Sequence, residues 1–165
     1  MLVAGHETTV NLIANGVLAL LRNPDELERL RQDPSLVRTA VEEVLRYDPP
    51  VQFTGRTARE GMEIGGEVLP KGHQCILLIA AANRDPAQYP DPERFDVGRA
   101  DNRHLAFGLG AHFCLGAPLA RVEGQVALDA VARDLGELQL DGDELEYKEN
   151  IILRGLAALP VTIGP

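Results

Sequence analysis

The amino-acid sequence predicts a mainly α-helical fold with small β-sheets. Apolar residues recur at helical spacing before residue 49 and again between residues 117 and 135. Between them, residues 51–75 are rich in β-branched residues and are divided by glycine-containing turns, which is typical of short strands. The chain has 165 residues, of which 45% are apolar and 25% charged, so it has the size and composition of one globular domain.

Three helices are predicted before residue 49. The first spans residues 2–22, where helical spacing relates Leu12, Ile13, Val17, Leu20 and Leu21. A short helix over residues 25–32 follows. A longer helix begins after Pro34 and ends at Pro49, with a buried face of Leu36, Val37, Ala40, Val41, Val44 and Leu45. Because the apolar pattern already runs at Met1 without a capping residue, we expect the chain to begin inside a helix.

The middle of the chain is predicted to be less regular. We expect residues 76–83 to form a strand that enters a short helix. Residues 84–104 contain three prolines and four aspartates with little periodicity, which indicates a long irregular segment. Such long loops are uncommon in a compact domain, so we expect this one to be ordered or to serve a function. A helix over residues 117–135 and terminal strands complete the prediction.

Charge and hydropathy exclude several partners. The net charge of -9 opposes long contacts with nucleic acid or with an anionic membrane. Residues 123–149 hold nine acidic and two basic residues, which predicts a solvated acidic face. The longest apolar run, Cys75 to Ala82, is far shorter than the roughly 18 residues of a membrane-spanning helix. Since no secretory signal pattern begins the sequence, we expect a cytoplasmic protein.

Two lone cysteines indicate neither a disulfide framework nor a zinc cluster, and they fit a reducing compartment. Cys114 lies in the glycine-rich segment FGLGAHFCLG, directly before a predicted helix. A helix amino terminus stabilises a thiolate, the form that binds a metal or attacks an electrophile. The alternative is a buried, inert cysteine. The segment fits neither a phosphate loop nor a dinucleotide fingerprint.

Two further segments carry chemistry. Glu43 and Arg46 lie one turn apart and can pair, although such pairs are usually solvated and Glu43 lies at the edge of the apolar face. Arg94, in the segment Pro92-Glu93-Arg94-Phe95, could complete a three-membered network; the alternative is a simple turn.

The segment Ala4-Gly5-His6-Glu7-Thr8-Thr9 places an acid and hydroxyl groups inside an apolar helix. Glycine and threonine predict a local distortion, and an acid next to an alcohol can relay protons. The alternative is a cap at a helix start. A zinc-protease motif is excluded because Val10 stands where the second histidine would be needed.

Together and in this order, these segments resemble the carboxy-terminal part of the cytochrome P-450 superfamily, most closely the soluble bacterial haem-thiolate monooxygenases. FGLGAHFCLG fits the haem-binding pattern FGxGxHxCxG, EVLR fits the ExxR helix, AGHETT fits the oxygen-activation segment and PERF fits the meander. The resemblance covers essentially the whole chain. It implies that residues 1–165 are a single partial domain of the P-450 fold, without the amino-terminal half.

The resemblance also implies a cofactor, haem b (iron protoporphyrin IX), with Cys114 as the metal ligand. His112 and Arg56 are the implied contacts of the haem propionates. The remaining haem-binding residues carried over from the motif are Phe107, Gly108 and Gly116.

The resemblance assigns two further groups of residues. Glu43, Arg46 and Arg94 are the implied buried ion network that supports the haem loop, and Glu7 and Thr8 are the implied catalytic residues that handle protons. Residues 153–156 occupy the place of the turn that reaches the substrate pocket.

The implied activity is insertion of one atom of dioxygen into a small organic substrate, with electrons from a ferredoxin or another redox partner. Three arginines near the cysteine loop are candidates for docking that partner: Arg99, Arg103 and Arg121. Two alternatives are a non-catalytic haem-binding module and an inactive fragment that serves as a structural or interaction domain. The presence of both Glu7 and Thr8 favours the enzyme over a simple haem binder.

Overall fold

The computed structural model describes residues 2–135, 137–142 and 144–164 of the chain. Its α-helices are α1 (Leu2–Arg22), α2 (Pro24–Gln32), α3 (Val37–Tyr47), α4 (Ile79–Ala82) and α5 (Ala117–Asp134). Two short 3-10 helices, η1 (Pro34–Leu36) and η2 (Gly110–His112), interrupt the connecting segments. The helices predicted from the sequence are confirmed.

The boundaries differ slightly from the predicted ones. Helix α2 begins at Pro24, because a proline in the first helical turn gives up an N–H that would have no partner there. Asp33 accepts a hydrogen bond from the N–H of Ser35 and so caps η1, which delays the regular α-helix until Val37.

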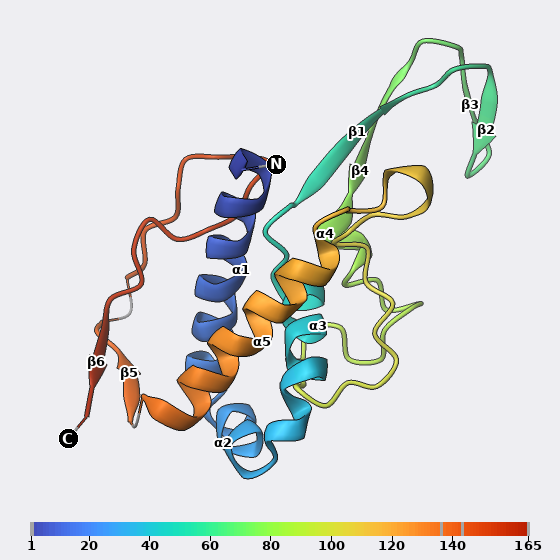
Figure 1. The fold of residues 1–165 in the computed structure, drawn as a ribbon. Helices are drawn as coiled ribbons and strands as arrows, with labels where there is room; N and C mark the ends of the chain where they lie inside the picture. The colour runs from blue at the N-terminus through green and yellow to red at the C-terminus, as the bar shows by residue number, and fades with distance from the viewer. Residues whose placement is uncertain (1, 136, 143, 165) are drawn as a thin grey trace.

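Among the described residues, the strands form three two-stranded antiparallel sheets. They pair β1 (Phe53–Thr57) with β4 (Gln74–Leu78), β2 (Met62–Ile64) with β3 (Glu67–Leu69), and β5 (Leu138–Leu140) with β6 (Val161–Ile163). Strand β4 runs directly into α4, as predicted for residues 76–83. The pairs β1–β4 and β2–β3 form an arm that extends away from the helices (Figure 1).

The core lies where α1, α3 and α5 pack together (Figure 1). Two glycines permit this close packing. A Cβ atom on Gly16 would lie 3.1 Å from the Leu128 side chain and 3.2 Å from that of Val44, and one on Gly124 would lie 3.2 Å from Val41. The three helices therefore approach more closely than larger residues at positions 16 and 124 would allow.

Residues 84–104 contain neither helix nor strand, as predicted. Phe95 and Val97 anchor this segment by burying their side chains in the helical core. Side chains from α3 hold much of the rest, as described below. No helix among the described residues is long and apolar enough to cross a membrane.

Candidate functional site

The cysteine loop, residues 107–116, presents Cys114 at the surface immediately before α5. Gly108 and Gly110 adopt φ angles of 69° and 70°, a left-handed conformation that glycine accommodates without strain. The N–H of Cys114 donates a hydrogen bond to the carbonyl of Phe107 at 2.9 Å. The loop is thus closed on itself with its thiol exposed, which is incompatible with the alternative of a buried cysteine.

Two adjoining hollows lie between the cysteine loop and the β1–β4 sheet. The larger, of about 490 Å³, has mostly apolar walls formed by Ile76, Leu77, Leu78, Ile79, Leu105 and Leu109, among others. The smaller, of about 400 Å³, brings Arg56 and His112 together beside Cys75. Arg56 and Ile76 line both hollows, so the two form one continuous surface.

These residues fit a flat apolar ring with acidic groups at its edge. The Arg56 guanidinium contacts only Thr54 Oγ1 at 3.1 Å and the Gly55 carbonyl at 2.7 Å, and within the described part of the chain no carboxylate pairs with it. His112 and Gly108 come from the loop that carries Cys114, although Cys114 itself does not line either hollow. A cysteine thiolate is one of the side-chain groups that can ligate haem iron, so the residues present are compatible with haem.

The pair Glu43–Arg46 is completely buried, so it is not one of the solvated surface pairs that are usual at this spacing. Arg46 Nε and Nη2 each donate to a Glu43 carboxylate oxygen at 2.8 Å, and both side chains are 0% exposed. The reason is that the irregular segment 84–104 covers this face of α3. Arg46 also donates to the carbonyls of Asn83 (3.1 Å), Pro92 (2.8 Å) and Arg94 (3.0 Å).

Arg94 does not join this network through its side chain, which corrects the prediction. Its guanidinium is 61% exposed and lies 3.8 Å from Glu26. Arg99 instead occupies the position in the network that was predicted for Arg94, because its Nε lies 3.2 Å from both carboxylate oxygens of Glu43. Arg99 also donates to the carbonyls of Pro90, Asp91 and Arg94.

The three arginines proposed for partner docking differ in accessibility. Arg99 is 11% exposed and bound to Glu43, so it is not available for docking, and that part of the prediction is wrong. Arg121 is bound to a carboxylate of α3. The Arg103 side chain is 89% exposed and pairs with Asp101.

Sequence reasoning missed a second cluster around Glu42. Arg121 donates to both oxygens of its carboxylate, at 2.7 and 2.9 Å, and His104 Nε2 lies 3.0 Å from Oε2. Burial opposes ionisation of Glu42, but the hydrogen bonds from His104 and Arg121 outweigh it and hold its pKa at about 2. The one signal in the sequence was the paired acids Glu42 and Glu43, only one of which belongs to the ExxR pattern.

Helix α1 runs unbroken through residues 4–9, so the predicted distortion is not observed. The Thr8 hydroxyl donates to the carbonyl of Ala4 at 2.7 Å, a back-bond that a regular helix accommodates. Glu7 is partly exposed, and its Oε1 lies 3.7 Å from Lys148 Nζ. Lys148 also donates to Asn11 Oδ1 at 3.1 Å, so the carboxy-terminal segment contacts the helix beside the acid.

The segment 153–156 is tied to the rest of the chain by two isolated antiparallel bridges. Leu153 pairs with Val51, next to β1, and Leu156 pairs with Tyr147. Leu156 is buried, whereas the preceding Ile151 and Ile152 are exposed.

Comparison with known proteins decides the family. A family model described as "Cytochrome P450" matches residues 32–136, which is more than half of the chain. The chain belongs to the cytochrome P450 family. This finding confirms the family and the fold class that the sequence motifs predicted.

Known P450 proteins resemble the chain over its whole length. It is 51% identical over 168 residues to a vitamin D(3) 25-hydroxylase of Pseudonocardia autotrophica, covering 100% of this chain and 42% of that protein. It is 48% identical over 160 residues to the biotin biosynthesis cytochrome P450 of Bacillus subtilis, covering 97% and 40% respectively.

Solved P450 structures agree. A structure of P450BioI bound to an acyl carrier protein that carries hexadec-9Z-enoic acid superposes with a TM-score of 0.95 at 48% identity, covering 98% of this chain and 42% of that one. The tirandamycin C-bound monooxygenase TamI gives 0.95 at 44% identity, covering 98% and 41%. The chain therefore spans about two fifths of the length of the P450 proteins that it matches.

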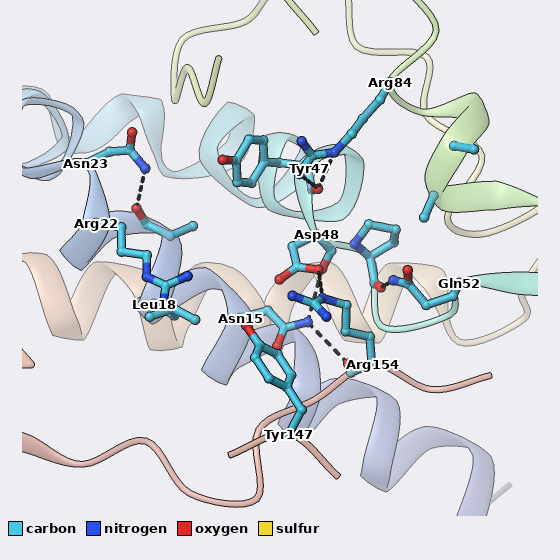
Figure 2. Close-up of a pocket in the computed structure, with 14 residues that line it drawn as sticks. Asn15, Leu18, Arg22, Asn23, Tyr47, Asp48, Gln52, Arg84, Tyr147 and Arg154 are labelled. Atoms are coloured by element: carbon cyan, nitrogen blue, oxygen red, sulfur yellow. Dashed lines mark hydrogen bonds and ion pairs between the residues drawn. The ribbon is translucent and has the colours of Figure 1, made fainter. Parts of the chain in front are cut away.

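A third hollow, of about 390 Å³, lies between α1, the end of α3 and the carboxy-terminal segment (Figure 2). Asn15, on α1, donates to the carbonyls of Asp48 (3.1 Å) and Arg154 (3.3 Å), and Arg154 Nε donates to the Asp48 carboxylate at 2.7 Å. Burial raises the pKa of Asp48, and the charge of Arg154 opposes this effect. These contacts join α1, the end of α3 and the carboxy-terminal segment.

Proposed function

We propose that this chain is the haem-holding part of a monooxygenase that inserts one atom of dioxygen into a small organic substrate. The observation that carries the proposal is the exposed Cys114, at the start of α5, beside a hollow that brings Arg56 and His112 together. The P450 proteins that resemble the chain include a hydroxylase and monooxygenases by name, which supports the reaction class.

Each residue of the proposed site has a separate task. The Cys114 thiolate ligates the iron of haem b, and a thiolate-ligated haem supplies the electron density that favours cleavage of the O–O bond. Arg56 and His112 bind the two propionates at the rim of the hollow, where Arg56 has an uncompensated charge. The glycines of the loop let the backbone approach the ring closely.

The loop places the sulfur by backbone contacts. The Cys114 N–H is held by the Phe107 carbonyl, and the exposed Phe113 and Leu109 offer apolar surface on the same loop. Apolar contacts around a sulfur exclude water and so favour a stable metal–thiolate bond. Gly116 completes the loop at the cap of α5, where a Cβ atom would lie 3.9 Å from Cys114 Sγ.

Glu7 and Thr8 handle protons in this proposal. The carboxylate of Glu7 is partly exposed, so it can exchange protons with solvent, and the Thr8 hydroxyl stands next to it on α1. The partners are the organic substrate, dioxygen and a ferredoxin or another redox protein, and the exposure of Arg103 supports it as a contact for that redox protein.

The complete reaction requires P450 sequence beyond these residues. An exposed apolar stripe begins at Leu115, just before α5, and continues along that helix at helical spacing with Leu119, Val122 and Val126. Such a surface is normally covered in a stable protein. This observation supports a monooxygenase part that does not turn over by itself, rather than the alternative of a non-catalytic haem-binding module.

A haem titration of the purified chain tests the proposal. We expect one haem per chain, and we expect the reduced, carbon monoxide-treated sample to show the red-shifted Soret band of thiolate ligation. The matched variants are Cys114→Ser, which should lose this band, and Cys75→Ser, which should keep it. An unchanged band in Cys114→Ser would refute the proposed ligand.

A second measurement tests catalysis. Electrons are supplied from NADPH through a surrogate reductase, first to the chain alone and then to the chain joined to the amino-terminal part of the Bacillus subtilis relative. Turnover that is seen in the joined protein but not in the 165-residue chain supports the partial-enzyme interpretation. In the joined protein, Glu7→Ala should slow turnover while leaving the haem spectrum unchanged.

A further inference from the structure

We propose that Glu42 is a positioning residue for the cysteine loop, which it holds through His104 on one side and Arg121 on the other. The inference rests on the proposed function, because it concerns the loop that carries the proposed metal ligand. Glu42 itself touches neither the hollow nor Cys114, so it acts only through its two partners.

The contacts of Glu42 connect three parts of the chain. Arg121, in the second turn of α5, donates to both carboxylate oxygens in a bidentate arrangement, at 2.7 and 2.9 Å. His104, just before the loop, binds Oε2 at 3.0 Å. One carboxylate on α3 therefore fixes the segment that enters the loop and the helix that leaves it.

The His104 ring is held in one orientation. Its Nδ1 accepts a hydrogen bond from the N–H of Ala106 at 3.2 Å, so Nδ1 carries no proton and Nε2 is the nitrogen that donates to Glu42. The ring is 3% exposed. The N–H of Leu105, the residue after His104, donates to Asn83 Oδ1 at 2.8 Å. The backbone that enters the loop is therefore held by hydrogen bonds at both Leu105 and Ala106.

Arg121 transmits this position to Cys114 through an aromatic ring. The carbon of its guanidinium group lies 4.7 Å from the centre of the Phe107 ring, which is within the range of a cation–π contact. The Phe107 ring also packs against His104 and, edge to face, against Phe113. The carbonyl of Phe107 accepts the N–H of Cys114, which completes the path from Glu42 to the thiol residue.

Adjacent carboxylates on α3 thus hold different segments. Glu43 holds the irregular segment before residue 103 through Arg46 and Arg99, whereas Glu42 holds residues 104–121. Neighbouring residues on a helix point about 100° apart, so a single helical turn serves both segments. The strong hydrogen bonds of Glu42 keep it ionised at neutral pH, as its pKa of about 2 indicates.

The test uses the haem-free chain, so it does not depend on the proposed function. Hydrogen exchange of the Cys114 amide is measured by NMR in Glu42→Gln, Arg121→Met and the control Arg103→Met, whose guanidinium is exposed. We expect exchange at Cys114 to accelerate about tenfold in the first two variants, as expected for loss of a charge-assisted hydrogen bond. The amide of Val44 in the core of α3 should be unaffected.

Arg121→Lys provides rescue and guards against misfolding. Lysine keeps the charge but lacks the planar fork, so exchange at Cys114 should lie between the rates of the wild-type chain and Arg121→Met. Equal exchange at Cys114 in Glu42→Gln, Arg121→Met and Arg103→Met would overturn the inference. So would equal acceleration at Val44, because that result indicates a general loss of stability.

A spectroscopic measurement then separates the two proposals. In haem-loaded samples, Glu42→Gln should retain haem but show a smaller share of the thiolate-ligated carbon monoxide band than Arg103→Met. Absence of haem binding in every sample would contradict the proposed function and leave the exchange result standing. An undiminished thiolate band in Glu42→Gln would contradict the positioning role alone.

Discussion

Replacement of Arg46 by methionine is the sharpest test of the buried network. Methionine approximates the length of the arginine but removes five hydrogen bonds: two to the Glu43 carboxylate and three to main-chain carbonyls. The charge of Glu43 would then remain buried without its bidentate partner. Breaking a buried ion pair by removing one member costs about 3–5 kcal/mol.

The surroundings of Glu43 limit this cost. Its carboxylate keeps hydrogen bonds from Arg99, Asn102 and the N–H of Asp96 in the variant. We therefore expect Arg46→Met to lower the free energy of unfolding by about 4 kcal/mol, a large part of the roughly 5–15 kcal/mol typical of a domain. The free energy of unfolding of Arg46→Lys should lie between those of the wild-type chain and Arg46→Met, because lysine restores the charge but has only three hydrogen-bond donors.

Urea unfolding followed by circular dichroism measures the effect. Arg103→Met is the matched control, since it removes the same group from a side chain that is 89% exposed, and it should change stability by less than about 0.5 kcal/mol. If Arg46→Met and Arg103→Met differed by less than about 1 kcal/mol, the assignment of Arg46 as the centre of the network would be refuted.

Three further predictions follow from other contacts. The pKa of the Glu42 carboxyl falls from an ordinary value of 4.5 to about 2 in the folded chain. Its ionised form therefore stabilises the fold by about 3 kcal/mol above pH 4.5, and this stabilisation is lost as the pH falls to about 2. In Glu42→Gln, the stability measured by acid unfolding should lack this pH-dependent contribution. Gly124→Val should destabilise the chain by about 2 kcal/mol in thermal unfolding, because its side chain would meet Val41, whereas Glu123→Val on the exposed face should have a much smaller effect. In Gly155→Ala, the new Cβ atom would lie 2.1 Å from Asn11 Oδ1, so limited proteolysis should cut the carboxy-terminal segment sooner; an unchanged cleavage rate would contradict that packing.

The sequence was sufficient to predict most elements of the fold. Apolar periodicity located α1, α2, α3 and α5, because each buries one face against the same core. Glycine and proline positions located the turns between the strands and the irregular segment. A motif predicted Cys114 and His112, the family resemblance predicted Arg56 from its position, and the structure brings Arg56 and His112 into one hollow.

The burial of Glu43 and Arg46 was implied by the family resemblance, but periodicity and spacing alone could not predict it. Periodicity places Glu43 at the edge of the apolar face, and only the course of segment 84–104 shows that this edge is covered. The same course decides that Arg99 rather than Arg94 turns towards Glu43, although both guanidinium groups can reach acids. The partners of Glu42 are 62 and 79 residues away along the chain, a separation that local patterns do not report.

The way in which Arg46 and Arg99 hold the irregular segment affects which substitutions it tolerates. Their guanidinium groups bind carbonyl oxygens of Pro90, Asp91, Pro92 and Arg94. Since every amino acid carries a carbonyl, a randomised library at positions 90, 92 and 94 should yield folded members in abundance. Position 91 is the exception, because its φ of 47° favours glycine, asparagine or aspartate. Engineering of this segment should therefore vary residues 90, 92 and 94 and leave Asp91, Arg46 and Arg99 unchanged.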